Sequence, residues 1–327
     1  MRVAAIPDLD PATYARHMVH AEDRVWVEKN CYVDIWLELL HSAKLEPRAM
    51  LPFVLGVDFE GDQWTFYKPG HDELRDLYGV DVQELNMWRP LLDQAVDFLG
   101  AGKLVSVEAD AWNLPDTSGT DYRTKHTKTT IVLNDLDVER QRLGYFHNAG
   151  YYALEGDDFV AALRVGVAPD PNYMPFYGEF IRLDRVERKS DGELRAESRA
   201  LAKKHLARRP KDNPVARFGA RFTTDLAWIT KEGLGFYHAW AFGTTRQLGS
   251  AFELAAIHAR WLGEGDANAA HFEEAAISFD KISTSMKTFI LKGARAVNGK
   301  KPLDASAMFE ETAAAWSSGM AALERAL

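Results

Sequence analysis

The sequence has little cysteine and no long apolar run, and each shortage excludes a class of protein. Cys31 is the only cysteine among 327 residues, so the chain has no internal disulfide. Residues 1–10 lack the charged stretch and apolar run of a secretory signal. Elsewhere charge interrupts each apolar stretch within about ten residues, short of the roughly twenty that span a bilayer. We therefore expect a cytoplasmic protein without a membrane segment.

The chain also has fewer basic than acidic residues. The chain has 48 acidic and 39 basic side chains and a formal net charge of -9, which argues against a protein that binds nucleic acid through its phosphates. It has no glycine-rich loop of the kind that cradles phosphates, and we expect no tightly bound cofactor. Hydrophobic residues make up 46% of the sequence, enough to bury one large core or two smaller ones.

The first clear helical pattern follows Asn30, a residue type that caps helix N-termini. It covers residues 31–41, and its apolar stripe consists of Val33, Trp36, Leu37 and Leu40. A second face of the same helix carries Cys31, Asp34, Glu38 and His41. We expect no metal site on this face, because helix positions ten residues apart are separated by about 15 Å, too far for one ion.

The remaining elements divide the chain into two parts. We expect a helix over residues 88–100 and strands over 104–109, 129–133, 142–146 and 179–183. The polar residues 134–137 are typical of a turn between antiparallel strands. Beyond residue 192 the pattern changes to long helices, at 193–208, 215–231, 235–262, 267–296 and 304–327. With a proline-containing linker at 208–214, the sequence predicts an α+β domain at 1–208 and an α-helical domain at 209–327.

Cys31 is the first candidate for chemistry. The thiolate is the reactive form of cysteine, and its pKa falls at a helix N-terminus, where unpaired N–H groups and the helix dipole favour negative charge. Cys31 opens the predicted helix. Buried cysteines are more often small apolar side chains, so position alone makes Cys31 a candidate nucleophile and no more.

A cysteine nucleophile needs a base within hydrogen-bond reach and a third group that orients the base. His126 precedes a predicted strand, where it is either that base or an exposed strand-edge histidine. The next strand ends at His147 and Asn148, beside His126 if the two strands form a hairpin. Successive strand residues point to opposite faces, so only one of the two can orient the base, and we favour Asn148. Asp110, at another strand end, is a candidate for orienting the base, for contacting substrate or for a structural role in the turn.

A cysteine at a helix start, followed by a histidine and an asparagine at strand ends, resembles the order found in papain-like cysteine enzymes. Residues 30–32, the aromatic segment near Gly61, and residues 103–110 and 112–115 before His126 resemble the butirosin-pathway acyltransferase family, which is papain-like. Over nearly its whole length the chain also resembles a family of uncharacterised bacterial proteins. The matching stretches are residues 30–34, 58–64 and 144–152.

The resemblance implies a papain-like cysteine-enzyme domain, with an N-terminal helix and an antiparallel sheet, followed by an α-helical domain. It also implies acyl transfer. An aminoacyl or acyl group leaves the phosphopantetheine thioester of a carrier protein, forms a thioester on Cys31 and passes to an amine. The implied partners are therefore an acyl or aminoacyl carrier protein, whose phosphopantetheine arm enters the site, and a small-molecule amine acceptor.

The oxyanion donor departs from the papain pattern. Papain-like proteases carry a glutamine six residues before the cysteine, and Val25 occupies that position here. The backbone N–H of Cys31 is one candidate donor. Asn30, Gln63 and Trp64 are candidates for the second donor or for contacting substrate, although Asn30 is expected to be occupied as the helix cap.

Two other functions remain open. The same Cys31 and His126 pair fits hydrolysis of a thioester or an amide, because transfer and hydrolysis differ only in the exclusion of water. A non-catalytic protein that binds a carrier protein also fits, because the glutamine is missing.

Two further clusters have a structural and a functional interpretation. A basic cluster comprises Lys203, Lys204, His205, Arg208, Arg209 and Lys211. It fits a docking surface for an acidic carrier protein, but we favour the interpretation that it is the solvated end of a helix. An aromatic cluster comprises Phe236, Tyr237, Trp240 and Phe242. Such a cluster is more typical of packing between helices than of a substrate pocket.

Overall fold

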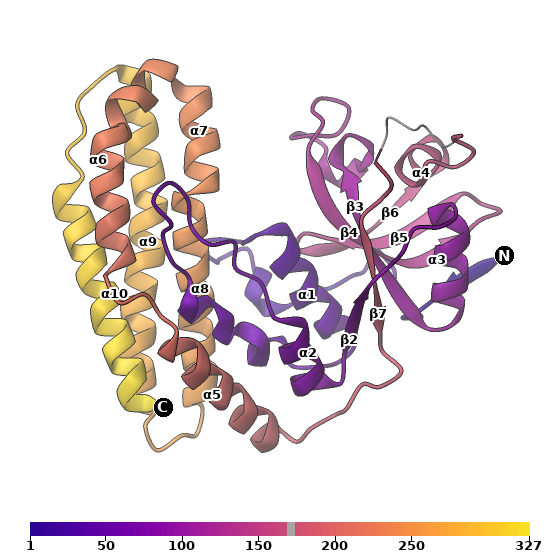
Figure 1. Ribbon diagram of the computed structural model, residues 1–327, viewed down its shortest axis with the longest axis horizontal. Coiled ribbons are helices and arrows are strands. Elements are labelled where there is room, and N and C mark those ends of the chain that lie inside the picture. The colour runs from indigo at the N-terminus through magenta and orange to yellow at the C-terminus, as the bar shows by residue number, and fades with distance from the viewer. Residues whose placement is uncertain (169–173) are drawn as a thin grey trace. The chain divides into compact units, whose positions relative to one another are not determined.

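A computed structural model of the protein describes residues 1–168 and 174–327 (Figure 1). The chain forms two units whose segments alternate along its N-terminal part. The first unit consists of Met1–Ala21, Asn30–Pro47 and Gly70–Lys189, and the second of Glu22–Lys29, Arg48–Pro69 and Ser190–Leu327. No helix within the described residues is long and apolar enough to cross a membrane.

The first unit is built on one antiparallel sheet, so the predicted α+β class is confirmed for this part of the chain. The strands are β1 (Arg2–Ala4), β2 (Asp81–Glu84), β3 (Lys103–Asp110), β4 (Lys128–Asp137), β5 (Arg142–His147), β6 (Gly150–Glu155) and β7 (Gly178–Arg182). Their order is β2-β7-β3-β4-β5-β6, and β1 pairs with β4 beside this path. The four strands expected from the sequence are present, whereas β1, β2 and β6 were not foreseen.

Strand β4 is longer than its sequence suggests. The polar residues 134–137, expected to form a turn, belong to the strand, and that prediction is wrong. The register of β4 against β5 shifts between Leu133 and Asp135, and the Asn134 side chain binds both the N–H and the carbonyl of Ile6, at 2.7 and 2.9 Å. A bulge that satisfies the amide in this way explains how a turn-forming residue type fits inside a strand.

Helices cover the sheet of the first unit. They are α1 (Cys31–Ser42), α2 (His71–Tyr78), α3 (Leu91–Gly100) and α4 (Gly156–Leu163), with short 3-10 turns η1 (Met18–His20), η3 (Ala111–Asn113) and η4 (Pro115–Thr117). Leu99 of α3 and Phe159 of α4 share a buried core with Ile131 and Leu133 of β4. Helix α1 contacts β4, β5 and β6, and its predicted range is confirmed (Figure 1). Helix α3 begins three residues later than expected, after Pro90.

A buried ionic cluster holds α1 in place. His20 contacts Asp34 through Nε2, at 3.0 Å, and Glu38 through Nδ1, and all three side chains are almost completely buried. Glu38 also accepts hydrogen bonds from the Tyr14 hydroxyl at 2.6 Å and from the His17 backbone N–H at 3.0 Å. Burial opposes the charged form of His20, but its hydrogen bonds to the two carboxylates outweigh burial and raise its pKa. The cluster therefore favours the charged form of His20 between the two carboxylates.

The second unit is helical. It contains a 3-10 segment, η2 (Pro47–Gly56), and the helices α5 (Asp191–Ala207), α6 (Pro214–Glu232), α7 (Leu234–Gly243), α8 (Thr245–Gly263), α9 (Ala269–Gly299) and α10 (Ser306–Ala326). One predicted helix, 235–262, is divided into α7 and α8 at Thr244, whose φ and ψ of -122° and -77° are not helical. Thr244 Oγ1 instead donates to the carbonyl of Trp240 at 2.7 Å.

The boundary between units lies earlier than the predicted position after residue 208. Ser190 begins α5 with a capping box that pairs it with Glu193, and the whole of α5 belongs to the second unit. Arg199 of α5 donates to the carbonyl of Ala326 at 3.1 Å and pairs with Asp266. The proline-containing segment 208–214 is therefore a connection between α5 and α6 within the second unit.

Residues 22–29 supply buried side chains to the second unit. The ring of Trp26 lies against Gly249 of α8, where a Cβ would approach the ring to 2.6 Å, and its Nε1 donates to Ser283 Oγ at 3.1 Å. Glu253 accepts from the backbone N–H of Trp26 at 3.2 Å and lies 3.5 Å from Lys29 Nζ, which is fully buried.

The two clusters singled out in the sequence have different environments in the second unit. Tyr237 is buried and donates to the carbonyl of Ile290 at 3.0 Å, and Trp240 packs on Phe218 and Phe222, while Phe242 is exposed. Among the basic residues, His205 is buried and Arg209 pairs with Glu324 at 3.0 Å. The basic residues therefore do not all belong to one solvated face.

The ionic cluster on α1 makes stability depend on pH. Burial acts to raise the pKa of Glu38, but hydrogen bonds from His20 and Tyr14 outweigh burial and lower it below 4.5. Glu38 therefore stabilises the fold above this value, and the contribution is lost as the pH falls through the lowered pKa. We expect Glu38→Gln to reduce the free energy of unfolding by about 3 kcal/mol near neutral pH, and by less in acid.

Urea unfolding of the full chain at a series of pH values measures this difference. Glu84→Gln is the matched control, because Glu84 is an exposed residue of the same unit. A destabilisation by Glu38→Gln that stays constant from neutral to acidic pH would contradict the assignment of an ionised, paired Glu38.

Candidate functional site

Cys31 is the first residue of α1, as the sequence predicts. Asn30 is extended, with φ and ψ of -144° and 153°, and its side chain accepts from the backbone N–H of Val33 at 2.9 Å. The cap starts the helix at Cys31, and this residue is partly exposed. The side chain of Asn30 is thus committed to the helix cap.

The surroundings of Cys31 oppose ionisation, in contrast to the expectation from its helix position. Burial and the negative charge of Asp34 raise the pKa of the thiol. Lys128 and a hydrogen bond from the Thr129 side chain act in the opposite direction but do not reverse the shift. A protonated thiol is therefore the resting form near neutral pH, and a nucleophilic role requires an acceptor for its proton.

His126 lies just before β4 and is held by a carboxylate. Its Nδ1 is 2.6 Å from Asp110 Oδ2, and its ring stacks on Trp112 with centroids 4.5 Å apart. Asp110 also accepts from the backbone N–H of Trp112 at 3.1 Å. Burial opposes the charged form of Asp110, but these hydrogen bonds outweigh it and lower the pKa of the carboxyl. The side chain of His126 is 73% exposed.

The residue that hydrogen-bonds the His126 ring is therefore Asp110, whereas the sequence predicts Asn148 for this contact. The register of β3 against β4 accounts for this contact, because Asp110 pairs with Lys128, two residues after His126. Asn148 lies in the turn between β5 and β6 with a φ of 44°, a left-handed conformation that asparagine tolerates better than most residues. The contact between His126 and Asp110 is part of the predicted site that the structure brings together.

His147, the alternative orienting residue, lies in a second histidine–carboxylate pair. It is 1% exposed, with Nδ1 at 2.5 Å from Asp116 Oδ2 and Nε2 at 2.8 Å from Thr129 Oγ1. The Thr129 hydroxyl is also one of the groups that act to lower the pKa of the Cys31 thiol. The Tyr145 hydroxyl donates to the other oxygen of Asp116.

Thr129 and Asp116 were not among the residues selected from the sequence. Thr129 lies two residues before Ile131, on a strand whose alternation was recognised, but threonine is common in strands and carries no chemical signal by itself. Asp116 lies in the short turn η4, where aspartate is an ordinary turn residue. Only the fold brings them to His147.

Gln63 and Trp64 belong to the second unit. Trp64 is buried and packs against Phe59 and Phe218, with ring centroids 5.4 and 5.6 Å apart. Gln63 is exposed, and its carbonyl accepts from the backbone N–H of Glu60 at 2.8 Å. Val25, at the position of the papain glutamine, donates its backbone N–H to Glu253 at 3.0 Å.

The acidic face of α1 is occupied by protein groups. Asp34 and Glu38 bind His20, and His41 Nε2 lies 3.2 Å from the carbonyl of Ala15. Across residues 1–168 and 174–327, no group of three or more histidine, cysteine, aspartate and glutamate side chains is arranged to hold a metal ion.

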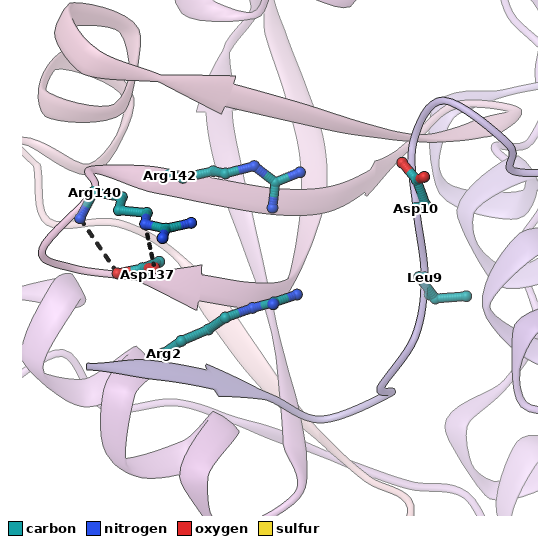
Figure 2. A pocket seen from close by; sticks show the side chains of 6 residues that line it. All are labelled: Arg2, Leu9, Asp10, Asp137, Arg140 and Arg142. Carbon is teal, nitrogen blue, oxygen red and sulfur yellow. Dashed lines mark hydrogen bonds and ion pairs between the residues drawn. The ribbon is translucent and has the colours of Figure 1, made fainter.

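A separate cavity of about 280 Å³ lies beside β1, β4 and β5 (Figure 2). It is lined by Arg2, Leu9, Asp10, Asp137, Arg140 and Arg142. Its cations are paired: Arg2 binds Asp135 through two hydrogen bonds, at 2.8 and 2.7 Å, and Arg142 binds Glu155 at 3.0 Å. Because carboxylates already neutralise the arginines, this cavity is an ion-pair network between strands and does not form an anion site.

Comparison with known families gives two matches that together cover most of the chain. The model of the DUF1839 N-terminal domain matches residues 15–183, and the model of the DUF1839 C-terminal domain matches residues 191–325. The gap between the matches contains the boundary at Lys189 and Ser190 that separates the last segments of the two units. No curated protein matches the chain.

The cap of α1 predicts the effect of a substitution beside Cys31. Asn30→Ala removes the acceptor of the Val33 N–H, and we expect a loss of about 1 kcal/mol in the free energy of unfolding. Asn30→Asp keeps an acceptor at the same position and serves as the control. Urea unfolding distinguishes the two, and equal stability of the alanine variant and the native protein would show that the cap contributes nothing.

Proposed function

The chain belongs to the DUF1839 family, and we propose that it is a cysteine-dependent acyltransferase in which Cys31 carries the acyl group. The observation that supports this proposal most directly is the placement of Cys31. It opens a capped helix, is partly exposed, and lies close enough to Lys128 at the start of β4 for that charge to act on the pKa of its thiol. His126, two residues before Lys128, is paired with the carboxylate of Asp110. Thiol, base and orienting carboxylate are the groups that covalent acyl transfer requires.

The arrangement of elements also supports a papain-like site. A helix with cysteine at its first position packs beside an antiparallel sheet, and the histidine precedes a strand of that sheet. The site differs from the papain pattern in its orienting group. His126 contacts the carboxylate of Asp110, where the papain pattern has an asparagine. A carboxylate in this position holds the Nδ1–H tautomer, so that Nε2 is free to accept a proton.

In the proposed reaction the Cys31 thiolate attacks the carbonyl carbon of an acyl or aminoacyl thioester on a carrier protein. The phosphopantetheine thiol leaves, and an acyl thioester forms on Cys31. An amine then attacks this thioester, its carbon–sulfur bond breaks, and the acyl group leaves Cys31 as an amide. The proton lost by the amine restores the Cys31 thiol. Because the first N–H groups of a helix have no intrahelical acceptor, we assign the Cys31 backbone N–H to the oxyanion formed in each step.

Intact mass measurement tests the proposal. The protein is mixed with carrier proteins loaded with different aminoacyl groups, without an amine acceptor, and we expect one acyl group to be added to the native chain. Cys31→Ala is the control and acquires no acyl group. Because Cys31 is the only cysteine, the absence of the adduct in Cys31→Ala assigns it to this thiol.

Other outcomes distinguish the alternatives. Release of free acid without an added amine would identify a thioesterase or hydrolase that uses Cys31 in the same way. Binding of the carrier protein without an adduct on Cys31, for every acyl group tested, would contradict catalysis and favour a carrier-binding protein.

A further inference from the structure

A cluster of two tyrosines, a histidine and a glutamate lies in the first unit, apart from the histidine–carboxylate pairs described above. Its members are Tyr32 of α1, His71 at the start of α2, Tyr177 just before β7, and Glu179 within β7. We call these four residues the Glu179 cluster. Tyr32 follows Cys31 directly, so the cluster and the candidate nucleophile share the first turn of one helix.

The carboxylate of Glu179 is the buried centre of the cluster. Its side chain is only 9% exposed, and each of its oxygens accepts from one phenol. The Tyr32 hydroxyl lies 3.3 Å from Oε2, and the Tyr177 hydroxyl lies 3.4 Å from Oε1. Both distances exceed the ~2.7 Å that is usual between a hydroxyl and an acceptor oxygen. A carboxylate has several lone pairs, so each oxygen can accept a further donor.

No lysine or arginine within residues 1–168 and 174–327 forms an ion pair with Glu179. The basic side chain that reaches it is His71, whose Nε2 lies 3.6 Å from Oε1 and 2.9 Å from the Tyr32 hydroxyl. The cross-strand neighbours of Glu179 are Glu84 on β2 and Ser106 on β3, and neither supplies a positive charge. Because buried charges are normally paired, a buried carboxylate in these surroundings is suited to a cationic ligand.

The two tyrosines suit an organic cation. Burial and the negative charge of Glu179 raise the pKa of both phenols, which therefore stay neutral near neutral pH. A neutral phenol offers oxygen lone pairs and a ring face that attracts cations. Tyr177 is 49% exposed and the His71 side chain 34%, so the cluster extends from the surface of the unit to the buried carboxylate.

We propose that the Glu179 cluster binds the primary ammonium group of a substrate. An ammonium group has three N–H donors, which match the two Glu179 oxygens and the oxygen of Tyr32, and Tyr177 contributes its ring or its oxygen. The inference rests on the proposed function, in which an aminoacyl donor and the amine acceptor both carry such a group. It adds a substrate class to that function, namely molecules with a free primary amine.

Binding of glycinamide tests the ammonium site without any acyl donor. Glycinamide carries one ammonium group, and N-acetylglycinamide is the matched neutral probe. NMR titration of the full chain with labelled tyrosines, near neutral pH, follows both probes. We expect the tyrosine signals to shift with glycinamide and not with N-acetylglycinamide. Glu179→Gln keeps the shape of the side chain and removes its charge, so we expect it to weaken glycinamide binding about tenfold or more.

Two further variants distinguish a specific site from a general effect of charge or folding. Glu84→Gln removes the same charge from the exposed cross-strand neighbour of Glu179, and we expect a change in affinity of less than about twofold. Tyr177→Phe removes one hydroxyl from an exposed side chain, and we expect binding to weaken about threefold. Circular dichroism verifies that each variant is folded. If Glu179→Gln does not fold, Tyr177→Phe decides the test, and native affinity in that variant rejects the site.

Three other results would overturn the ammonium site: no binding of glycinamide to the native protein, equal binding of the two probes, or native affinity in folded Glu179→Gln. A loss of stability in Glu179→Gln, with no amine bound by the native protein, would assign the carboxylate a structural role beside His71.

Carrier proteins loaded with glycyl and with acetyl groups identify the substrate that the site holds. If it holds the donor, Glu179→Gln slows adduct formation on Cys31 from the glycyl carrier and not from the acetyl carrier. If it holds the acceptor, the substitution slows transfer to glycinamide and leaves both adducts unchanged. Glycinamide binding without any adduct would retain the site and reject the proposed function, whereas adducts without glycinamide binding would do the reverse.

Discussion

The first unit depends on the hydrogen-bond ladder of β4. This strand pairs with β1, β3 and β5, and its alternation directs Ile131 and Leu133 into the core beneath α3 and α4. A shift of one residue would turn every one of these side chains to the other face. The same register places Asp110 beside His126 and brings Thr129 to His147. Core and candidate site are therefore specified by one set of backbone hydrogen bonds.

The anchoring of α1 has a cost for the chemistry of its first residue. Asp34 is held in place by His20, and its fixed negative charge lies one helical turn from Cys31, where it disfavours a thiolate. Asp34 and burial both raise the pKa of the Cys31 thiol, and the helix dipole is not sufficient to reverse this shift. The nucleophilic role that we propose for Cys31 therefore requires a proton acceptor that is already positioned.

The parts of the fold that follow from local pattern were predictable. Asn30 and the apolar stripe define α1, and the β-rich stretches define β3, β4 and β5. The turn assigned to 134–137 failed because a bulge and contacts with Ile6, far away in sequence, override the local preference of asparagine. The position of the unit boundary failed for a similar reason, since the contacts of α5 with α10 and Asp266 are non-local.

For the candidate site, the sequence identified the residue types that carry chemistry but not their partners. Cys31 and His126 stand out because of their chemistry and their positions at element ends. Asp116 and Thr129 do not, because an aspartate in a turn and a threonine in a strand are ordinary residues until a buried histidine is placed between them. The contact between Asp116 and His147 could not be predicted from the sequence, because the two residues are 31 positions apart.

The alternation of segments along the N-terminal part of the chain has a consequence for synthesis on the ribosome. Trp26 and Lys29 are made early, yet their buried partners Gly249, Glu253 and Ser283 emerge more than two hundred residues later. The second unit cannot close until then, so residues 22–29 and 48–69 remain without their native core while most of the chain is translated. During this interval, residues 22–29 and 48–69 would be a binding target for a chaperone that shields short aromatic segments.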